Sequence, residues 1–148
     1  MVRAYIYLIS FKNTNDIYIG KTTLSIKRRF YQHKSSGTVY EYVNKNFNKD
    51  WSNVFIDVID SVDMNEDLTH LLNHPLNIIT NSKFEFRKYT SDYKTKQGLL
   101  NHRLTYTEHF HIHNYNNDDK YNVINKKITN AYDVYDNYKF YNIYIKNE

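Results

Sequence analysis

The residue that is hardest to explain by packing alone is a glutamate on an apolar helix face. The sequence predicts a helix over residues 96–114. The residues that recur there at every fourth position, and therefore share one face, are Leu100, Leu104, Glu108 and Ile112. Glutamate is almost never buried without a partner, because taking its charge out of water is costly. Its hard oxygen atoms suit Mg²⁺ or Mn²⁺, so Glu108 is a candidate metal ligand, with an ion pair to Arg103 or to a histidine as the alternative.

Two tyrosine-rich apolar runs near the N-terminus place hydroxyl groups on one face of a predicted hairpin. Residues 5–11 and 16–22 are rich in β-branched and aromatic residues and enclose the polar tetrad KNTN, which is typical of a β-hairpin. In the register that this turn sets, Tyr7 lies opposite Gly20, and Tyr18 shares their face because side chains alternate along a strand. The residues predicted to line the opposite, apolar face are Ile6, Leu8, Ile17 and Ile19.

A helix is predicted directly after the hairpin, over about residues 24–35, with the hydroxyl of Thr22 or Thr23 as its cap. Arg29 and His33 are four residues apart and flank the apolar stripe of this helix. We therefore expect them to face the border of the sheet rather than open solvent. Taken alone, the two residues also fit an ordinary helix surface.

Together these residue types can hydrolyse a phosphodiester. Such a reaction needs an activated water, a cation near the phosphate and support for the leaving oxygen. A guanidinium can hold a phosphate through two hydrogen bonds, and a carboxylate can hold the metal. A free tyrosine has a pKa of about 10 and is a poor base at neutral pH unless cations stabilise its phenolate. Lys21, Arg29 and the metal are candidates for that stabilisation.

The same residues carry a family resemblance. In chain order they are Tyr5-Ile6-Tyr7, Tyr18-Ile19-Gly20, Arg29, His33, Glu108 and Asn122. Their order and approximate spacing resemble the motifs of the GIY-YIG nuclease superfamily, over about residues 4–124. The first motif begins with Tyr5 where the motif that names the family has a glycine, while Tyr7 is retained.

The resemblance implies an α+β fold, in which a three-stranded antiparallel sheet is flanked by helices, and a metal-dependent phosphodiesterase activity on DNA. It implies that Tyr7 is the general base or orients the attacking water, with Tyr18 beside it. It also implies that Glu108 holds a single Mg²⁺ or Mn²⁺. Arg29 would hold the phosphate, and His33 would accept a hydrogen bond from a tyrosine or relay its proton. Cleavage would leave a 5′-phosphate and a 3′-hydroxyl.

Further residues are candidates for contacts with the nucleic acid. They are Gly20, Lys21, Lys27, Arg28, Lys34 and Asn122. The cations would neutralise phosphates, Gly20 would leave room for a phosphate, and Asn122 would bind the backbone or brace the site from a loop. A solvated surface is the alternative for the basic residues, and sheet packing is the alternative for the tyrosines. A non-cleaving nucleic-acid-binding domain of the same fold is therefore the alternative function.

Composition limits the class of protein. The 148 residues carry a formal net charge of +4, no cysteine, three glycines and one proline. The charge favours a polyanionic partner, because Lys and Arg that neutralise phosphates release counterions, although heavy use of Lys, Asn, Ile and Tyr is also typical of AT-rich genomes. Without cysteine, disulfides and thiolate metal sites are excluded. No apolar run reaches the length of about 18 residues that a membrane span needs, so we expect a soluble intracellular protein without a membrane partner.

The rest of the chain is predicted to complete one domain of 148 residues. A second helix is predicted over about residues 39–47 and a third strand over residues 53–60. Another helix is predicted from Asp63 or Asn65 to Leu72. Residues 73–95 have no sustained period and are predicted to be an insertion before the helix that carries the glutamate. Residues 126–148 are predicted to be a tyrosine-rich C-terminal extension.

The expected protein is a small stand-alone DNA endonuclease of viral, phage or mobile-element type, acting on double-stranded or branched DNA. If the source is viral, the compartment is the cytoplasm or the nucleus of the host cell. The sequence shows no separate helix-turn-helix or zinc-finger module, so sequence-specific cutting would depend on the insertion, on the extension or on a homodimer.

Overall fold

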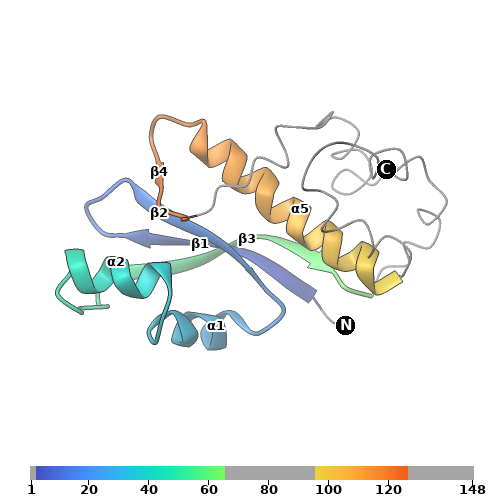
Figure 1. Ribbon diagram of the computed structural model, residues 1–148, viewed down its shortest axis with the longest axis horizontal. Helices are drawn as coiled ribbons and strands as arrows, with labels where there is room; N and C mark the ends of the chain where they lie inside the picture. The colour runs from blue at the N-terminus through green and yellow to red at the C-terminus, as the bar shows by residue number, and fades with distance from the viewer. Residues whose placement is uncertain (1–2, 66–95, 127–148) are drawn as a thin grey trace.

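The structure, a computed structural model, describes residues 3–65 and 96–126 (Figure 1). Its elements are β1 (Arg3–Phe11), β2 (Asp16–Thr22), α1 (Ile26–His33), α2 (Thr38–Asn46), β3 (Val54–Asp63), α5 (Lys96–Asn116) and β4 (Asn122–Val123). The strands form one sheet in the order β3-β1-β2-β4. Helices α1 and α2 cover one face of the sheet and α5 lies across the other (Figure 1). This mixed arrangement confirms the predicted α+β class.

The hairpin of β1 and β2 has the predicted register, with Tyr7 opposite Gly20. The four-residue turn between the strands places Asn13 at φ 64°, a left-handed conformation that asparagine tolerates. The amide N–H and the hydroxyl of Thr14 both donate to the carbonyl oxygen of Phe11, at 3.1 and 2.9 Å. A four-residue connection stabilised in this way sets which strand residues stand opposite each other.

Strict alternation in the hairpin divides the core into two apolar layers. On one face, the apolar layer joins sheet residues to residues of α1 and α2 and includes Tyr7, Ile9, Phe11, Ile26, Phe30, Val39 and Val43. On the other face, the apolar layer joins sheet residues to residues of α5 and includes Ala4, Ile6, Ile17, Ile19, Leu104 and Ile112. Both predicted faces are confirmed. The tyrosine hydroxyls therefore lie in the layer under α1.

Strand β3 pairs antiparallel with β1 and ends three residues after the predicted strand over residues 53–60. A bulge interrupts the alternation of its side chains, so the sequence pattern stops before the strand does. The register shifts between Ile6 and Tyr7, where Ile59 is the extra residue on β3. One extra residue moves every later side chain to the opposite face of the sheet. Val62 consequently faces α5 and joins the apolar layer there.

Strand β4 corrects the predicted three-stranded sheet to four strands. Its two residues pair in parallel with Asp16 and Ile17 at the start of β2. Asn125 extends this contact, because its side-chain amide donates to the carbonyl oxygen of Ile19 at 2.7 Å and accepts from its N–H at 3.1 Å. Two residues are too few to produce a periodic pattern, so this strand leaves no signal in the sequence.

Helix α1 begins two residues later than predicted. Its cap is Ser25, whose hydroxyl accepts a hydrogen bond from the N–H of Arg28 at 3.2 Å. The hydroxyl of Thr22 instead accepts from the N–H of Leu24, in the turn before the helix. The predicted cap at Thr22 or Thr23 is therefore wrong, because β2 keeps the chain extended as far as Thr22 and the helix can start only after the turn.

Helix α2 matches the second predicted helix to within a residue at each end. Gly37 precedes it with φ 98°, a conformation that glycine adopts without strain. No side chain caps the N-terminus of α2. Val39 and Val43 of this helix are fully buried under the sheet.

Helix α5 confirms the predicted helix and its apolar stripe, of which Leu100, Leu104 and Ile112 are buried. His111 fastens the helix to β3 through a contact of 2.8 Å between its Nε2 and Oδ2 of Asp60. This hydrogen bond holds the pKa of Asp60 below its usual range, although partial burial opposes it. The position of α5 is thus determined both by apolar packing and by one polar contact.

None of the described helices is long and apolar enough to cross a membrane. A helix that starts at Asp63 is wrong, because Asp63 is the last residue of β3. The rest of that predicted helix, from residue 66 to residue 72, lies outside the described residues, as do the insertion over residues 73–95 and the extension over residues 126–148 apart from residue 126. The single domain over residues 1–148 therefore stays a prediction.

Replacing Gly20 by alanine should destabilise the protein. A Cβ at this position would overlap Oη and Cζ of Tyr7, whose fully buried ring would have to shift. We expect Gly20→Ala to lower the free energy of unfolding by about 1–3 kcal/mol, measured by urea denaturation. Thr23→Ala, at an exposed position nearby, should change it by less than about 0.5 kcal/mol. Wild-type stability of Gly20→Ala would contradict the placement of Tyr7 over Gly20.

Candidate active site

The hydroxyl of Tyr7 lies at the centre of a buried hydrogen-bond network. Its Oη accepts a hydrogen bond from Nε of Arg29 at 3.0 Å and lies 2.6 Å from Nε2 of His33. Strand β1 supplies the tyrosine, and α1 supplies the other two residues from positions four apart, which share one helix face. Because a guanidinium can only donate, the hydrogen of the Tyr7 hydroxyl is left to be donated to His33. The structure thus brings together three residues that the sequence singles out.

The surroundings of this network set its protonation at neutral pH. Burial, followed by the neighbouring Tyr18, raises the pKa of Tyr7, while the Arg29 guanidinium opposes the shift. Burial and then the charge of Arg29 lower the pKa of His33 to about 4. At neutral pH the phenol is therefore protonated, and His33 is uncharged and able to accept the phenol proton.

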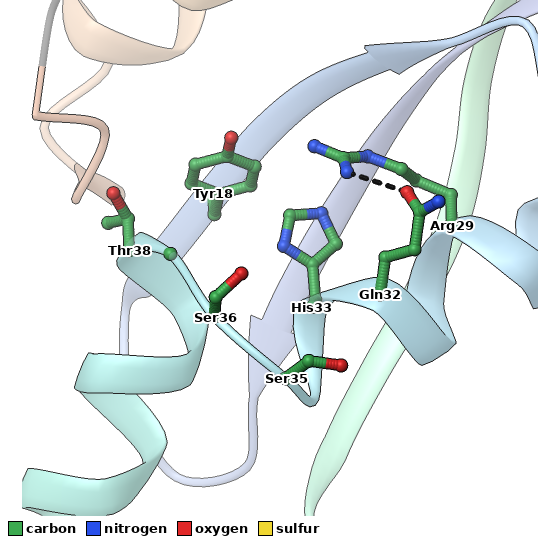
Figure 2. A pocket seen from close by; sticks show the side chains of 8 residues that line it. Tyr18, Arg29, Gln32, His33, Ser35, Ser36 and Thr38 are labelled. Atoms are coloured by element: carbon green, nitrogen blue, oxygen red, sulfur yellow. Dashed lines mark hydrogen bonds between the residues drawn. The ribbon is translucent and has the colours of Figure 1, made fainter.

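An open cleft of about 470 Å³ lies beside the network (Figure 2). Its walls come from Tyr18 of β2, from Arg29 and His33 of α1, and from residues 35–38 before and at the start of α2. Tyr18 packs edge-on against His33 with ring centroids 5.3 Å apart, and its hydroxyl makes no hydrogen bond to any described residue. Tyr7 is fully buried and does not line the cleft. Tyr18 is thus the tyrosine whose hydroxyl is available to a bound molecule.

Gln32 holds the guanidinium of Arg29 from the other side. Nη1 of Arg29 donates to Oε1 of Gln32 at 3.0 Å, as the dashed line in Figure 2 shows. Arg29 is consequently fixed at two of its nitrogen atoms, while Nη2 makes no hydrogen bond within the described part of the chain. Gln32 is not among the site residues predicted from the sequence. The signal that could have found it is its spacing of three residues from Arg29, which places both on one helix face.

Glu108 is a largely buried carboxylate, with its side chain 16% exposed. Among the described residues its one polar contact is with Nε2 of His109 at 3.9 Å, which is too long for a hydrogen bond. Burial raises the pKa of Glu108, and the charges of Lys21 and Arg29 lower it. After burial, the charge of Glu108 is the next cause that raises the pKa of Tyr18. Glu108 therefore acts electrostatically on residues of the cleft, although it does not itself line the cleft.

These surroundings fit a hard divalent cation. The predicted ion pair between Glu108 and Arg103 is not formed, and burial followed by the charge of Lys21 lowers the pKa of His109 to about 4, so His109 is neutral. Within residues 3–65 and 96–126, the carboxylate thus has no hydrogen-bond donor and no charged partner in direct contact. No group of three or more His, Asp or Glu residues that could hold a metal occurs in residues 3–65 and 96–126. A lone carboxylate suits Mg²⁺, which usually keeps several waters and binds substrate phosphates.

Two of the residues predicted to contact nucleic acid have structural roles. Gly20 is buried, and the space next to it is filled by the ring of Tyr7 rather than left for a phosphate. Asn122 is exposed on β4, donates to Oδ1 of Asp16 at 2.8 Å and does not line the cleft. Asn125 adds a further contact to β2, because its side chain pairs with the backbone of Ile19.

The predicted phosphate-binding cations fall into two groups. Nζ of Lys21 donates to Oγ1 of Thr105 at 2.6 Å, so this lysine is held against α5. Lys27, Arg28 and Lys34 are exposed together on the outer side of α1, and none of them lines the cleft. Their contacts with nucleic acid stay predictions.

The low pKa of His33 predicts a loss of stability in mild acid. On unfolding, its pKa returns from about 4 to the ordinary value of 6.5, so between these values the unfolded chain binds a proton that the native protein excludes. Stability should therefore fall as the pH is lowered through this window, with a contribution of about 2–3 kcal/mol from His33. Urea denaturation of the wild type at about pH 7 and about pH 4.5 measures the fall.

His33→Gln is the matched variant for this measurement, because glutamine does not titrate. Its stability should decrease less between the two pH values than that of the wild type. An equal decrease in both proteins would show that His33 is not the group responsible.

Comparison with known families agrees with this geometry. Residues 3–66 match the family model described as the GIY-YIG catalytic domain. No curated protein and no solved structure matches the chain. The matched residues include β1, β2, α1, α2 and β3, while α5 with Glu108 lies beyond them. Residues 3–66 of this chain are therefore similar to the GIY-YIG catalytic domain.

Proposed function

We propose that the protein is a metal-dependent DNA endonuclease that hydrolyses phosphodiester bonds. The observation that carries the proposal is the Tyr7 hydroxyl, held between Arg29 and His33 directly behind the cleft. A phenol with a phosphate-binding cation on one side and a proton acceptor on the other is suited to take a proton from a water beside a phosphate. The family match over residues 3–66 supports the same class of activity.

In this proposal Arg29 binds the scissile phosphate in the open cleft. A guanidinium can contact two phosphate oxygens at once and spread the charge that develops in the transition state. Arg29 donates to both Tyr7 and Gln32 in the structure, and by releasing Tyr7 it would present its Nε–Nη2 edge to two phosphate oxygens. This movement uncovers the otherwise buried Tyr7 hydroxyl. Phosphate binding would thus admit the attacking water to the base.

The water is activated by a relay through Tyr7. The water passes a proton to Oη of Tyr7 while the phenol passes its own proton to Nε2 of His33. A relay fits the raised pKa of Tyr7, because no free phenolate has to form. Tyr18, whose hydroxyl has no partner among the described residues, orients the water.

Bond making and bond breaking follow from this arrangement. The water oxygen forms a bond to phosphorus as the bond from phosphorus to the leaving 3′-oxygen breaks. Solvent supplies the proton for that oxygen. The products are a 5′-phosphate and a 3′-hydroxyl.

Glu108 would hold one Mg²⁺ or Mn²⁺, which supplies positive charge to the phosphate and to the leaving oxygen. Lys21 supports this role, because its charge opposes the effect of burial and favours the ionised carboxylate. The hydrogen bond from Lys21 of β2 to Thr105 holds the lysine side chain against α5, the helix that carries Glu108.

The proposed substrate is DNA, either double-stranded or branched. The net charge of +4 and the exposed cations on α1 favour a polyanion. The open form of the cleft leaves room for a polymer that continues beyond the reacting phosphate.

Removal of the proposed metal ligand or of the proposed base should abolish cleavage. Plasmid, nicked and branched DNA are incubated with Mg²⁺ or Mn²⁺, and the wild type is compared with Glu108→Gln and Tyr7→Phe. Each variant should cleave at least about a hundredfold more slowly, and chelation of the metal should stop the wild type. Tyr18→Phe should lose only about tenfold, because it loses one orienting hydrogen bond.

Glu41→Gln is the matched carboxylate control for this assay. Glu41 is exposed, forms an ion pair of 2.5 Å with Lys126 and lies outside the cleft, so this variant should cleave at the wild-type rate. A larger loss in Tyr18→Phe than in Tyr7→Phe would assign the base to Tyr18. A wild type that binds DNA but leaves every substrate intact with both metals would favour the non-cleaving domain.

The role of Arg29 is tested by a substitution that keeps its positive charge and removes the planar guanidinium. Arg29→Lys retains a cation but loses the fork that bridges two phosphate oxygens and the Nε donor to Tyr7. We expect single-turnover cleavage to slow by at least about tenfold, while affinity for DNA changes by less than about threefold. Arg3→Lys, at an arginine that contacts the hydroxyl of Ser61 outside the cleft, is the control. Wild-type cleavage by Arg29→Lys would contradict the bidentate contact.

A further inference from the structure

A second hollow lies on the outer side of α1 and has no part in the proposed reaction. It is about 540 Å³ in volume and is lined by Ser25, Lys27, Arg28, Phe30, Tyr31 and Lys34. We call it the α1 groove. Arg29 and His33 of the same helix line the cleft, so the cleft and the groove lie on opposite sides of α1. One short helix thus borders two separate hollows.

An aromatic ring stands open at this groove. Tyr31 is 72% exposed, and neither its ring nor its hydroxyl has a partner among the described residues. An exposed aromatic residue alone needs no explanation. Here, however, Tyr31 lies next to Phe30 and the methylene chains of Lys27 and Arg28, which give the groove an apolar floor. A flat apolar ligand could stack on Tyr31 and still contact that floor.

Three cations surround the floor without acidic neighbours. The side chains of Lys27 and Arg28 form no hydrogen bond or ion pair with any described residue. The ammonium of Lys34 lies over the rings of Phe30 and Trp51, at 5.1 and 5.9 Å from their centroids. No carboxylate lines the groove. Its charge is therefore complementary to a polyanion.

An exposed aromatic ring beside three cations favours one kind of polyanion. A duplex presents phosphates but hides the faces of its bases, so it would leave the exposed ring of Tyr31 without a role. A single strand offers both phosphates and base faces, and bases stack on aromatic side chains without regard to sequence. We infer that the α1 groove binds single-stranded DNA, with a base stacked on Tyr31 and phosphates contacted by Lys27, Arg28 and Lys34.

This inference rests on the proposed nuclease function and narrows its substrate class. A helix with its side chains is about 10–12 Å wide, so a strand that leaves the cleft at Arg29 needs only a few nucleotides to cross α1. The preferred substrate would be a branched DNA whose single-stranded arm lies in the groove while the scissile phosphate lies in the cleft.

Binding without cleavage tests the inference. Fluorescence anisotropy in the presence of a chelator measures the affinity of the full chain for a labelled oligothymidine and for a blunt duplex. Tyr31→Ala should weaken binding of the single strand by about fivefold to a hundredfold and affect the duplex less. Tyr31→Phe should retain the affinity, because phenylalanine can still stack. Phe55→Ala, at an aromatic residue on β3 that is 48% exposed, is the matched control and should bind as the wild type does.

The salt dependence of binding tests the cations separately. Each phosphate contact to a single strand contributes about 0.7 to the slope of log affinity against log salt. Lys27→Ala combined with Arg28→Ala should therefore reduce the slope for oligothymidine by about 1.4. Lys12→Ala combined with Lys45→Ala removes the same charge at exposed positions outside the groove and should leave the slope unchanged.

The outcomes separate this inference from the nuclease proposal. Equal affinity of Tyr31→Ala and the wild type for oligothymidine, equal losses on single strand and duplex, or no binding of oligothymidine by the wild type would each overturn the groove assignment. A protein that binds the single strand through Tyr31 but cleaves no DNA would overturn only the nuclease function. If cleavage depends on Tyr7 and Glu108 while Tyr31→Ala binds and cleaves as the wild type does, only the assignment of the α1 groove would be overturned.

Discussion

The arrangement around the cleft depends on one buried phenol hydroxyl. A hydroxyl that is fully removed from water must be hydrogen-bonded, and Tyr7 meets this requirement only when α1 is docked so that Arg29 and His33 both reach it. The ring also requires the absence of a side chain at Gly20 on the neighbouring strand. Strand register, helix position and protonation are consequently coupled. A change in any one of them leaves a polar group buried without a partner.

Helix α5 introduces a second buried polar group, the carboxylate of Glu108. Leu104 and Ile112 on either side of it pack in the apolar layer, and the contact between His111 and Asp60 holds the helix against the sheet. The nearby cations Lys21 and Arg29 favour its charged form, yet no described residue donates a hydrogen bond to it. A buried carboxylate without a donor costs stability, which a protein retains where the carboxylate has a task. The metal-ligand role proposed for Glu108 is such a task.

Several features of the fold could be predicted because they depend on near neighbours in the chain. Two strands with alternating side chains and a four-residue turn between them are sufficient to place Tyr7 opposite Gly20, and the structure confirms this register. The spacing of four residues likewise predicts α5 and the inward position of Glu108. The sequence also selects Arg29 and His33 as a pair on one helix face. It could not show that both meet the same hydroxyl, because that contact joins two distant elements.

The sequence by itself therefore determined the hairpin, the helix faces and the set of candidate side chains, since each follows from local periodicity and from residue chemistry. Only the tertiary structure decided the bulge at Ile59, the short strand β4 and the bracing contact of Asn125. It also decided that Tyr7 is enclosed while Tyr18 faces the cleft. These features arise from contacts between residues far apart in the chain. Local preferences do not encode such contacts, because their energy exists only once the sheet and helices have packed.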